Sequence, residues 1–295
     1  METALQQAFN ALSVSSILLL VGLGLAITFG LMRVINMAHG EFIMAGAYMT
    51  FLCGQIFKSN PNLAFVLAIP VAFAVTASLG YLLETTVISR LYGRPLDTLL
   101  ATWGISLILQ QAARSIFGSQ NVDVTAPSFL EGQLTMGPVT MPYLRLFIIA
   151  LSVICVLGTA YFLYKTPWGR RIQAVMQNRP MASCLGISTR KVDAIAFSLG
   201  SGLAGVAGCA VALLGSIGSS TGTNYIVDAF MVVVLGGVGT VLGTVAGAIG
   251  IGALGTGWET VTSASLGKVL AFICVIAFLQ WKPAGIIAVK SRALD

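Results

Sequence analysis

The sequence predicts an all-α integral membrane protein, a polytopic bundle of about 8–10 transmembrane helices with interrupted or re-entrant segments. Of its 295 residues, 57% are hydrophobic and only 9% are charged, whereas soluble domains carry about a quarter of charged residues. No charged residue lies between Glu2 and Arg33, or between Asp228 and Glu259. Each stretch exceeds the roughly 20 apolar residues that cross a bilayer as a helix. These observations exclude a soluble protein.

Charged and turn-forming residues divide the chain into apolar segments that we expect to be helices within a single transmembrane domain, 1–295. The first of them lacks the basic start of a cleaved signal peptide, so we expect it to be a mature span. The regions 41–57 and 225–258 are short and rich in glycine, and both are candidates for broken or re-entrant helices. The predicted segments are 9–32, 41–57, 63–83, 98–117, 144–164, 192–215, 225–238, 241–258 and 264–281.

The basic residues predict the orientation of the chain. Three regions, 90–94, 165–191 and 282–292, hold 11 of the 16 Lys and Arg residues, and alternation of the segments places all three on one side. Cytoplasmic loops are enriched in Lys and Arg, so we expect this side, with the C-terminus, to be cytoplasmic. The connection 118–143 has no basic residue and should be external. The net charge of +6 then reflects these loops and not a nucleic-acid partner.

A polar block, Arg33-Val-Ile-Asn-Met-Ala-His-Gly-Glu41, separates the first two segments. One interpretation is a short cytoplasmic turn, in which Asn36 or Gly40 caps the following helix. The other is a discontinuous helix whose end points into a polar pathway, because such groups are tolerated at depth only where they line a cavity or are buried in protein. The candidate pathway residues here are Asn36, His39 and Glu41.

A second interruption is predicted at Gly236, Gly237 and Gly239, since glycine costs about 1 kcal/mol relative to alanine inside a helix. The later glycines, Gly243 and Gly247, follow at four-residue spacing and favour close helix packing. Interrupted segments in both halves of a membrane protein are typical of a transport site. We therefore pair this break with the one at 33–41.

The cytoplasmic connection 165–191 has a short amphipathic pattern. It could be a surface helix that lies on anionic lipid, or it could dock a cytoplasmic partner, which the neutral run 181–188 inside a basic loop favours. Its apolar positions are Ile172, Val175, Met176, Met181, Cys184 and Leu185.

Several chemistries are excluded by missing motifs. The chain has no GxxxxGK[ST] nucleotide loop, no HExxH, no paired-cysteine motif and no GxSxG elbow, so we expect neither an enzyme nor a bound metal. Lone ionisable residues such as Arg114, Asp193 and Asp228 lie near segment ends, where they are expected to cap helices or reach the interface. Only His39 and Glu41 are placed for proton coupling, which weakens an ion-driven mechanism.

These features resemble one family. The segments GLAITFGLMRVINMAHGEFIMAGAY (24–48) and FMVVVLGGVGTVLGTVAGAIG (230–250) are similar to the permease subunits of branched-chain amino-acid ABC importers. Within that family, VMQNRPMASCLGIST (175–189), YIVDAFMVVV (225–234) and LGKVLAFICVIAFLQWKPAGIIAVKSRA (266–293) most resemble the urea-transport permeases of the UrtB type. The resemblance runs over nearly the whole chain from residue 14.

The resemblance implies a coupling helix at 175–189 that contacts an ATPase subunit, with Met181 where many importers have a glutamate. It also implies that both interruptions approach the translocation path. The implied partners are a second homologous permease, two cytoplasmic ATPase subunits that hydrolyse the ATP, and a periplasmic substrate-binding protein; no cofactor is implied in this chain. The implied coupling residues are Met176, Met181, Ala182, Cys184, Leu185 and Gly186.

The leading functional expectation is a permease subunit in a bacterial inner membrane that forms half of a path for urea or a short amide. Urea is neutral, so its path needs hydrogen-bonding groups and not buried counter-charges. One alternative is a branched-chain amino-acid importer permease, and another is a stand-alone channel or ion-coupled carrier. A membrane enzyme is the weakest hypothesis, because no catalytic constellation is visible.

Overall fold

The computed structural model describes residues 2–32, 35–136 and 139–287. Arg33 of the polar block lies outside the described residues. Lys290 and Arg292, which were used to predict the orientation, also lie outside them. The elements are α1 (Glu2–Met32), α2 (His39–Ile56), α3 (Pro61–Thr86), η1 (Ile88–Arg90), α4 (Pro95–Phe117), η2 (Ser128–Leu130), β1 (Gln133–Met136), β2 (Val139–Pro142), α5 (Tyr143–Lys165), α6 (Pro167–Gln177), α7 (Arg179–Cys184), α8 (Thr189–Ala212), α9 (Thr221–Gly236), α10 (Val241–Glu259) and α11 (Ala264–Trp281).

The predicted fold class, an all-α polytopic membrane protein, is confirmed. Each of the nine predicted apolar segments corresponds to a separate helix. Among the described residues, six helices are long and apolar enough to span a bilayer: α1, α3 with η1, α5, α8, α10 and α11. The other three are marginal for physical reasons, because α2 begins with His39-Gly-Glu41, α4 contains Asp97 and Arg114, and α9 has only 16 residues.

Helices α1 and α8 form the centre of the bundle. In the most apolar stretch of each, 83% of the residues are buried, against 28% in α5 and 17% in α11. Small residues make this packing possible, because they let helix backbones approach closely. A Cβ at Gly24 would collide with the carbonyl of Gly200, and one at Gly46 would collide with Gly205. Glycines therefore bring α1 and α2 onto α8.

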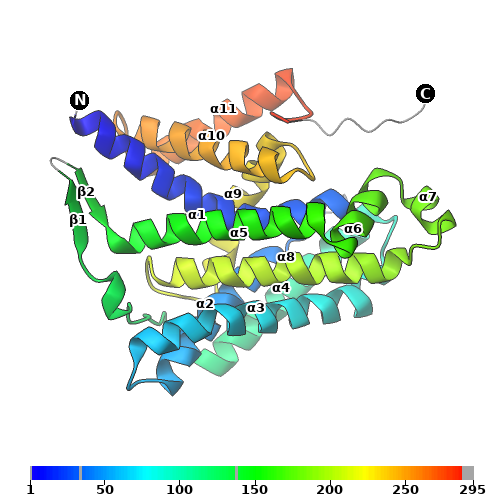
Figure 1. The fold of residues 1–295 in the computed structure, drawn as a ribbon, viewed down its shortest axis with the longest axis horizontal. Helices are drawn as coiled ribbons and strands as arrows, with labels where there is room; N and C mark the ends of the chain where they lie inside the picture. The colour runs from blue at the N-terminus through cyan, green and yellow to red at the C-terminus, as the bar shows by residue number, and fades with distance from the viewer. Residues whose placement is uncertain (1, 33–34, 137–138, 288–295) are drawn as a thin grey trace.

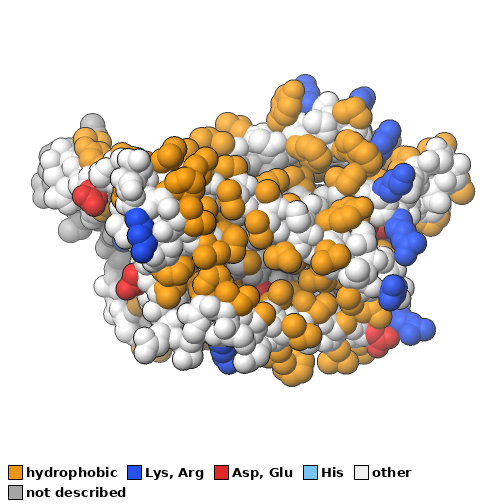
Figure 2. All heavy atoms as spheres, turned by 90° about the horizontal axis from the view of Figure 1, so that it is seen from below, with side chains coloured by type: hydrophobic (Ala, Val, Ile, Leu, Met, Phe, Trp, Pro, Cys, Tyr) orange, Lys and Arg blue, Asp and Glu red, His pale blue; other side chains and the backbone are white. Residues whose placement is uncertain are grey.

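The two ends of the bundle differ. Figure 1 shows the β1–β2 hairpin at one end and α6 with α7 at the other. In Figure 2, basic side chains gather at the α6–α7 end and hydrophobic side chains cover the middle. The antiparallel hairpin, in which Gln133 faces Pro142, falls in the predicted external connection and was not predicted as strands. The short exposed segment is held partly through Gln6, whose amide bonds the backbone of Thr140.

Candidate functional site

The first interruption lies inside the protein. After α1 ends at Met32, the chain turns at residues 35–38, where the side chain of Asn36 accepts a hydrogen bond from the N–H of Ala38 (3.0 Å). Asn36, His39 and Glu41 are 5%, 0% and 1% exposed. His39 Nε2 lies 3.4 Å from the carbonyl oxygen of Val21 in the middle of α1. This burial rules out an exposed cytoplasmic turn for these three residues.

Glu41 is the centre of a polar cluster built from three helices. Its Oε1 accepts hydrogen bonds from Ser106 Oγ and Gln110 Nε2 of α4, each at 2.9 Å. Gln110 also bonds Thr223 Oγ1 of α9 at 3.2 Å. The other carboxylate oxygen, Oε2, is buried with no hydrogen-bond partner among the described residues. Polar groups at this depth are expected to face a pathway or a partner helix.

Sequence reasoning missed Ser106, Gln110 and Thr223. Ser106 and Gln110 lie in the predicted segment 98–117, which was judged by its overall apolarity, and Thr223 lies just before the predicted segment 225–238. The available signal was the i, i+4 spacing of Ser106 and Gln110, which places both on one face of a helix. A polar stripe on an otherwise apolar membrane helix points to a protein-facing or water-facing surface.

The second interruption is a real break between α9, which ends at Gly236, and α10, which begins at Val241. Gly237 and Gly239 adopt φ values of 106° and 83°, which L-residues with a side chain rarely adopt. The segment after α11 covers the open end of α9, because Ile286 N–H and Ile287 N–H bond the carbonyls of Leu235 (2.8 Å) and Gly236 (3.0 Å).

The polar residues of the first interruption do not meet the glycines of the second. Gly40, beside the first break, lies against the backbone of Gly222 in the first turn of α9, whereas Gly239 lies beside Gly30 near the end of α1. At 1.5 Å per residue, Gly222 and Gly236 are about 20 Å apart along α9. Residues Asn36, His39 and Glu41 therefore form one group, and Gly236, Gly237 and Gly239 form another, at the two ends of the same helix.

A cavity of about 580 Å³ adjoins the second interruption. It is lined by residues of α1, α5 and α6, by the α9–α10 break and by Pro283 and Ala284. Met176 of α6 reaches into this region, since its terminal methyl would contact a Cβ placed on either Gly30 or Gly239. A second cavity, of about 340 Å³, lies between α2, α3 and residues 123–125.

The predicted coupling segment folds into two short helices. Asn178 caps α7, with its side chain accepting a hydrogen bond from the N–H of Met181 at 3.0 Å. Met181 and Leu185 are 57% and 74% exposed, Cys184 and Gly186 are also exposed, and Ala182 is buried. The helix ends at Cys184, and Gly186, two residues further on, has φ 80°. Of the six predicted coupling residues, Met176 stands apart because it is half-buried on α6.

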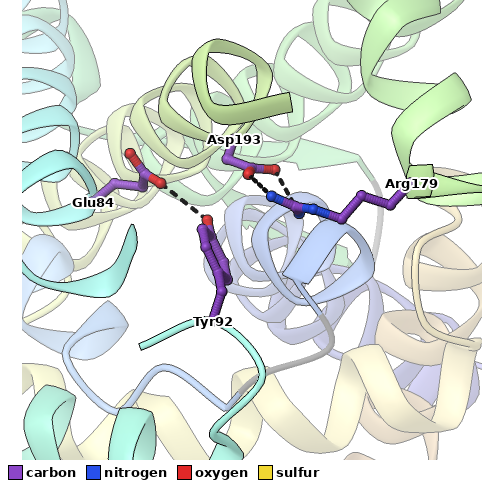
Figure 3. Close-up of polar contacts among 4 residues, drawn as sticks. All are labelled: Glu84, Tyr92, Arg179 and Asp193. Atoms are coloured by element: carbon purple, nitrogen blue, oxygen red, sulfur yellow. Dashed lines mark hydrogen bonds and ion pairs between the residues drawn. The ribbon is translucent and has the colours of Figure 1, made fainter. Parts of the chain in front are cut away.

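A four-residue polar network lies beside α7 (Figure 3). Arg179, the first residue of α7, forms an ion pair with Asp193 of α8, and its guanidinium lies 4.8 Å from the ring centre of Tyr92. The Tyr92 hydroxyl donates a hydrogen bond to Glu84 Oε1 of α3 at 3.0 Å. Both carboxylates are fully buried. None of the four was predicted as a site residue.

Comparisons with known proteins agree with this architecture. The family model described as "Branched-chain amino acid transport system / permease component" matches residues 7–279. The branched-chain amino acid transport permease BraD of Pseudomonas aeruginosa is 28% identical over 292 residues, which cover 96% of this chain and 95% of the relative. A probable branched-chain amino acid permease, LivH of Methanocaldococcus jannaschii, is 30% identical over 97% of this chain and 93% of its own length.

A weaker match covers a third of the chain: the autoinducer 2 import permease LsrC of Photorhabdus laumondii is 37% identical over 105 residues, or 33% of this chain and 32% of the relative. None of these three relatives is named for urea, so the urea-specific prediction gains no support from them. The family-level prediction is confirmed: the chain belongs to the permease-component family of branched-chain amino acid transport systems.

Proposed function

We propose that the chain is the permease subunit of an ABC importer for branched-chain amino acids. The observation that carries the proposal is the match of its family over residues 7–279, nearly the whole chain. Permease components are transport subunits and not enzymes, which fits the sequence, since it carries no P-loop. ATP is hydrolysed in this proposal by separate ATPase subunits.

The proposed complex also contains a second homologous permease and a periplasmic substrate-binding protein, and it lies in a bacterial inner membrane. The basic α6–α7 end (Figure 2) supports a cytoplasmic location for that end, and with it a cytoplasmic C-terminus. The exposed apolar side chains of Met181 on α7 and of Leu185 just after it support docking of an ATPase, because an apolar patch left exposed on a water-facing surface is typical of an interaction site.

The substrate path proposed here has two parts. Asn36, His39 and Glu41 line the part within the helix bundle. There, Glu41 with Ser106 and Gln110 offers buried polar groups. Gly236, Gly237 and Gly239 form a hinge near the coupling end. Met176 connects that hinge to α6, so movement of the coupling segment would reach the α9–α10 break directly.

The substrate class is the branched-chain amino acid in preference to urea, because full-length relatives are named for these amino acids. Competition separates the two. In vesicles that hold the complete importer, uptake of labelled leucine should fall with excess unlabelled isoleucine and stay unchanged with excess urea. Uptake of labelled urea that leucine does not inhibit would contradict the substrate assignment and leave the permease assignment intact.

A further inference from the structure

Helix α7 has few contacts of its own to fix its position. It contains six residues, well below the roughly 12–15 that an isolated helix needs to be even marginally stable in water. Its side chains at Met181, Ser183 and Cys184 are exposed, and Ala182 is the buried one. Besides Ala182, which packs in a hydrophobic cluster with Ile172 and Val192, contacts at its ends therefore fix the orientation of α7.

Arg179 supplies such a contact at the N-terminal end of α7. Its two terminal nitrogens pair with the two carboxylate oxygens of Asp193, with Nη1 3.2 Å from Oδ1 and Nη2 bonded to Oδ2. This is the bidentate fork that makes Arg–carboxylate pairs geometrically specific. Asp193 is fully buried, so the pair is anchored inside α8.

The contact extends beyond α8. Tyr92, in the connection between η1 and α4, lies under the Arg179 guanidinium and donates its hydroxyl to Glu84 near the end of α3. Figure 3 shows the tyrosine between the buried glutamate and the ion pair. Four parts of the chain thus meet at one cluster: α3, the α3–α4 connection, α7 and α8.

Moving α7 away from this cluster would leave the buried Asp193 carboxylate without its cation, which is strongly unfavourable. Displacement of α7 should therefore carry α8 with it. Because α8 is one of the two central helices of the bundle, the movement would reach the polar cluster centred on Glu41.

We infer that the Arg179–Asp193 pair, with the Tyr92 ring packed against the guanidinium, is a latch that fastens α7 to α8. Arg179 is then a positioning residue for the coupling of ATP hydrolysis to transport. The inference rests on the proposed function of α7 as the coupling helix. It assigns Arg179 a mechanical role that is separate from the exposed residues proposed to touch the ATPase.

The transport test compares Arg179→Ala with Arg94→Ala in the reconstituted importer. Arg94 forms an exposed pair with Asp97 at the same end of the protein, with side chains 74% and 54% exposed, and so is a matched control. We expect Arg179→Ala to keep ATP hydrolysis and assembly while uptake per ATP falls about tenfold, and Arg94→Ala to behave as wild type. Wild-type coupling in Arg179→Ala would overturn the inference.

If Arg179→Ala fails to assemble, Arg179→Lys replaces it. Lysine keeps the charge but cannot bind both carboxylate oxygens in a fork, so we expect a partial loss of uptake per ATP in a folded complex. Coupling equal to wild type in Arg179→Lys would overturn the proposed role of the bidentate pair.

A second readout does not depend on transport. A nitroxide on the exposed native Cys184 reports the motion of α7 in the full-length permease in lipid nanodiscs, with Cys184→Ser as the labelling control. We expect higher nitroxide mobility in Arg179→Ala than in wild type and in Arg94→Ala. Equal nitroxide mobility in Arg179→Ala and wild type would overturn the latch, whether or not ATP-driven uptake is found. Raised mobility in Arg179→Ala without any ATP-driven uptake by the wild-type complex would support the latch and contradict the proposed function.

Discussion

At the scale of single residues, glycines decide where helices touch. Gly46 of α2 faces the backbone of Gly205 in α8, and a Cβ at Gly46 would collide with it, whereas a Cβ at Gly54 of the same helix would meet open space. Overpacking a tight contact costs about 1–3 kcal/mol. The two glycines therefore form a matched pair for mutation.

We predict that Gly46→Ala lowers the thermal stability of the purified protein by an amount that corresponds to about 1–3 kcal/mol. Gly54→Ala should be neutral or slightly stabilising, because alanine favours the helix. Thermal unfolding followed by size-exclusion chromatography in detergent measures both. Equal stability of the two variants would show that α2 and α8 do not pack at Gly46.

Tyr92 predicts how stability depends on pH. Burial, followed by the nearby Asp193 and Glu84 carboxylates, raises the pKa of Tyr92 above its usual value, which is about 10 in the unfolded chain. The stabilisation is therefore present below pH 10 and is lost as the pH rises above 10, by at most about 1.4 kcal/mol per pH unit. Unfolding measured from pH 8 to pH 11 should show a smaller alkaline loss in Tyr92→Phe than in wild type. An identical loss in both would exclude Tyr92 as its source.

Individual polar partners were the least predictable feature from sequence. Asp193 and Asp228 were expected to cap helices or reach the interface, yet Asp193 pairs with Arg179 and Asp228 accepts a bond from Lys268 at 2.8 Å. Each partner lies on another helix, and a pairing across helices leaves no local pattern in the chain. His39 and Glu41 could be singled out because they are rare ionisable residues within an apolar region.

At the scale of elements, both interruptions could be predicted from the sequence, but their positions relative to each other in space could not. Local composition marks each break, since a polar block precedes α2 and glycines end α9. Their separation by the length of α9 depends on tertiary packing, which the sequence pattern does not contain. The packing role of the later glycines is confirmed, because Gly243 and Gly247 lie against the backbone of α9.

The α9–α10 break gives a prediction for one position. Gly237 has φ 106° and faces the carbonyl of Ile287 in the segment that covers the end of α9. Gly237→Ala should cost about 1–3 kcal/mol in backbone strain, displace that segment and reduce uptake. Gly250→Ala is the control, because its Cβ would meet only the Leu235 side chain at 3.4 Å. Thermal unfolding and ATP-driven uptake measure both variants, and normal values for Gly237→Ala would contradict the assigned role of the break.

At the scale of the whole molecule, the helical membrane fold follows from composition and charge spacing alone. All nine predicted segments are helices, since long apolar runs in lipid have few other ways to satisfy their backbone hydrogen bonds. The burial of α1 and α8 at the centre could not be predicted, because every segment is apolar and hydropathy does not distinguish lipid-facing from protein-facing helices.

The orientation across the membrane predicts a labelling pattern. Cys184 is the exposed one of the five cysteines, and it lies on α7 at the basic end. A membrane-impermeant maleimide should label it in inside-out vesicles and not in intact cells, and Cys184→Ser should abolish the signal. Labelling in intact cells would place the α6–α7 end outside and reverse the proposed topology.

In the proposed importer this chain forms part of a path whose driving force comes from other subunits. The most direct test is leucine uptake into proteoliposomes that contain the permease pair with wild-type ATPases, with ATPases inactivated at the nucleotide site, or with none, each supplied with the binding protein. Of the three preparations, we predict that only the one with wild-type ATPases accumulates leucine, and that it does so in an ATP-dependent manner. Equal leucine uptake by the chain without any ATPase subunit would contradict this dependence on other subunits and identify a stand-alone channel or carrier.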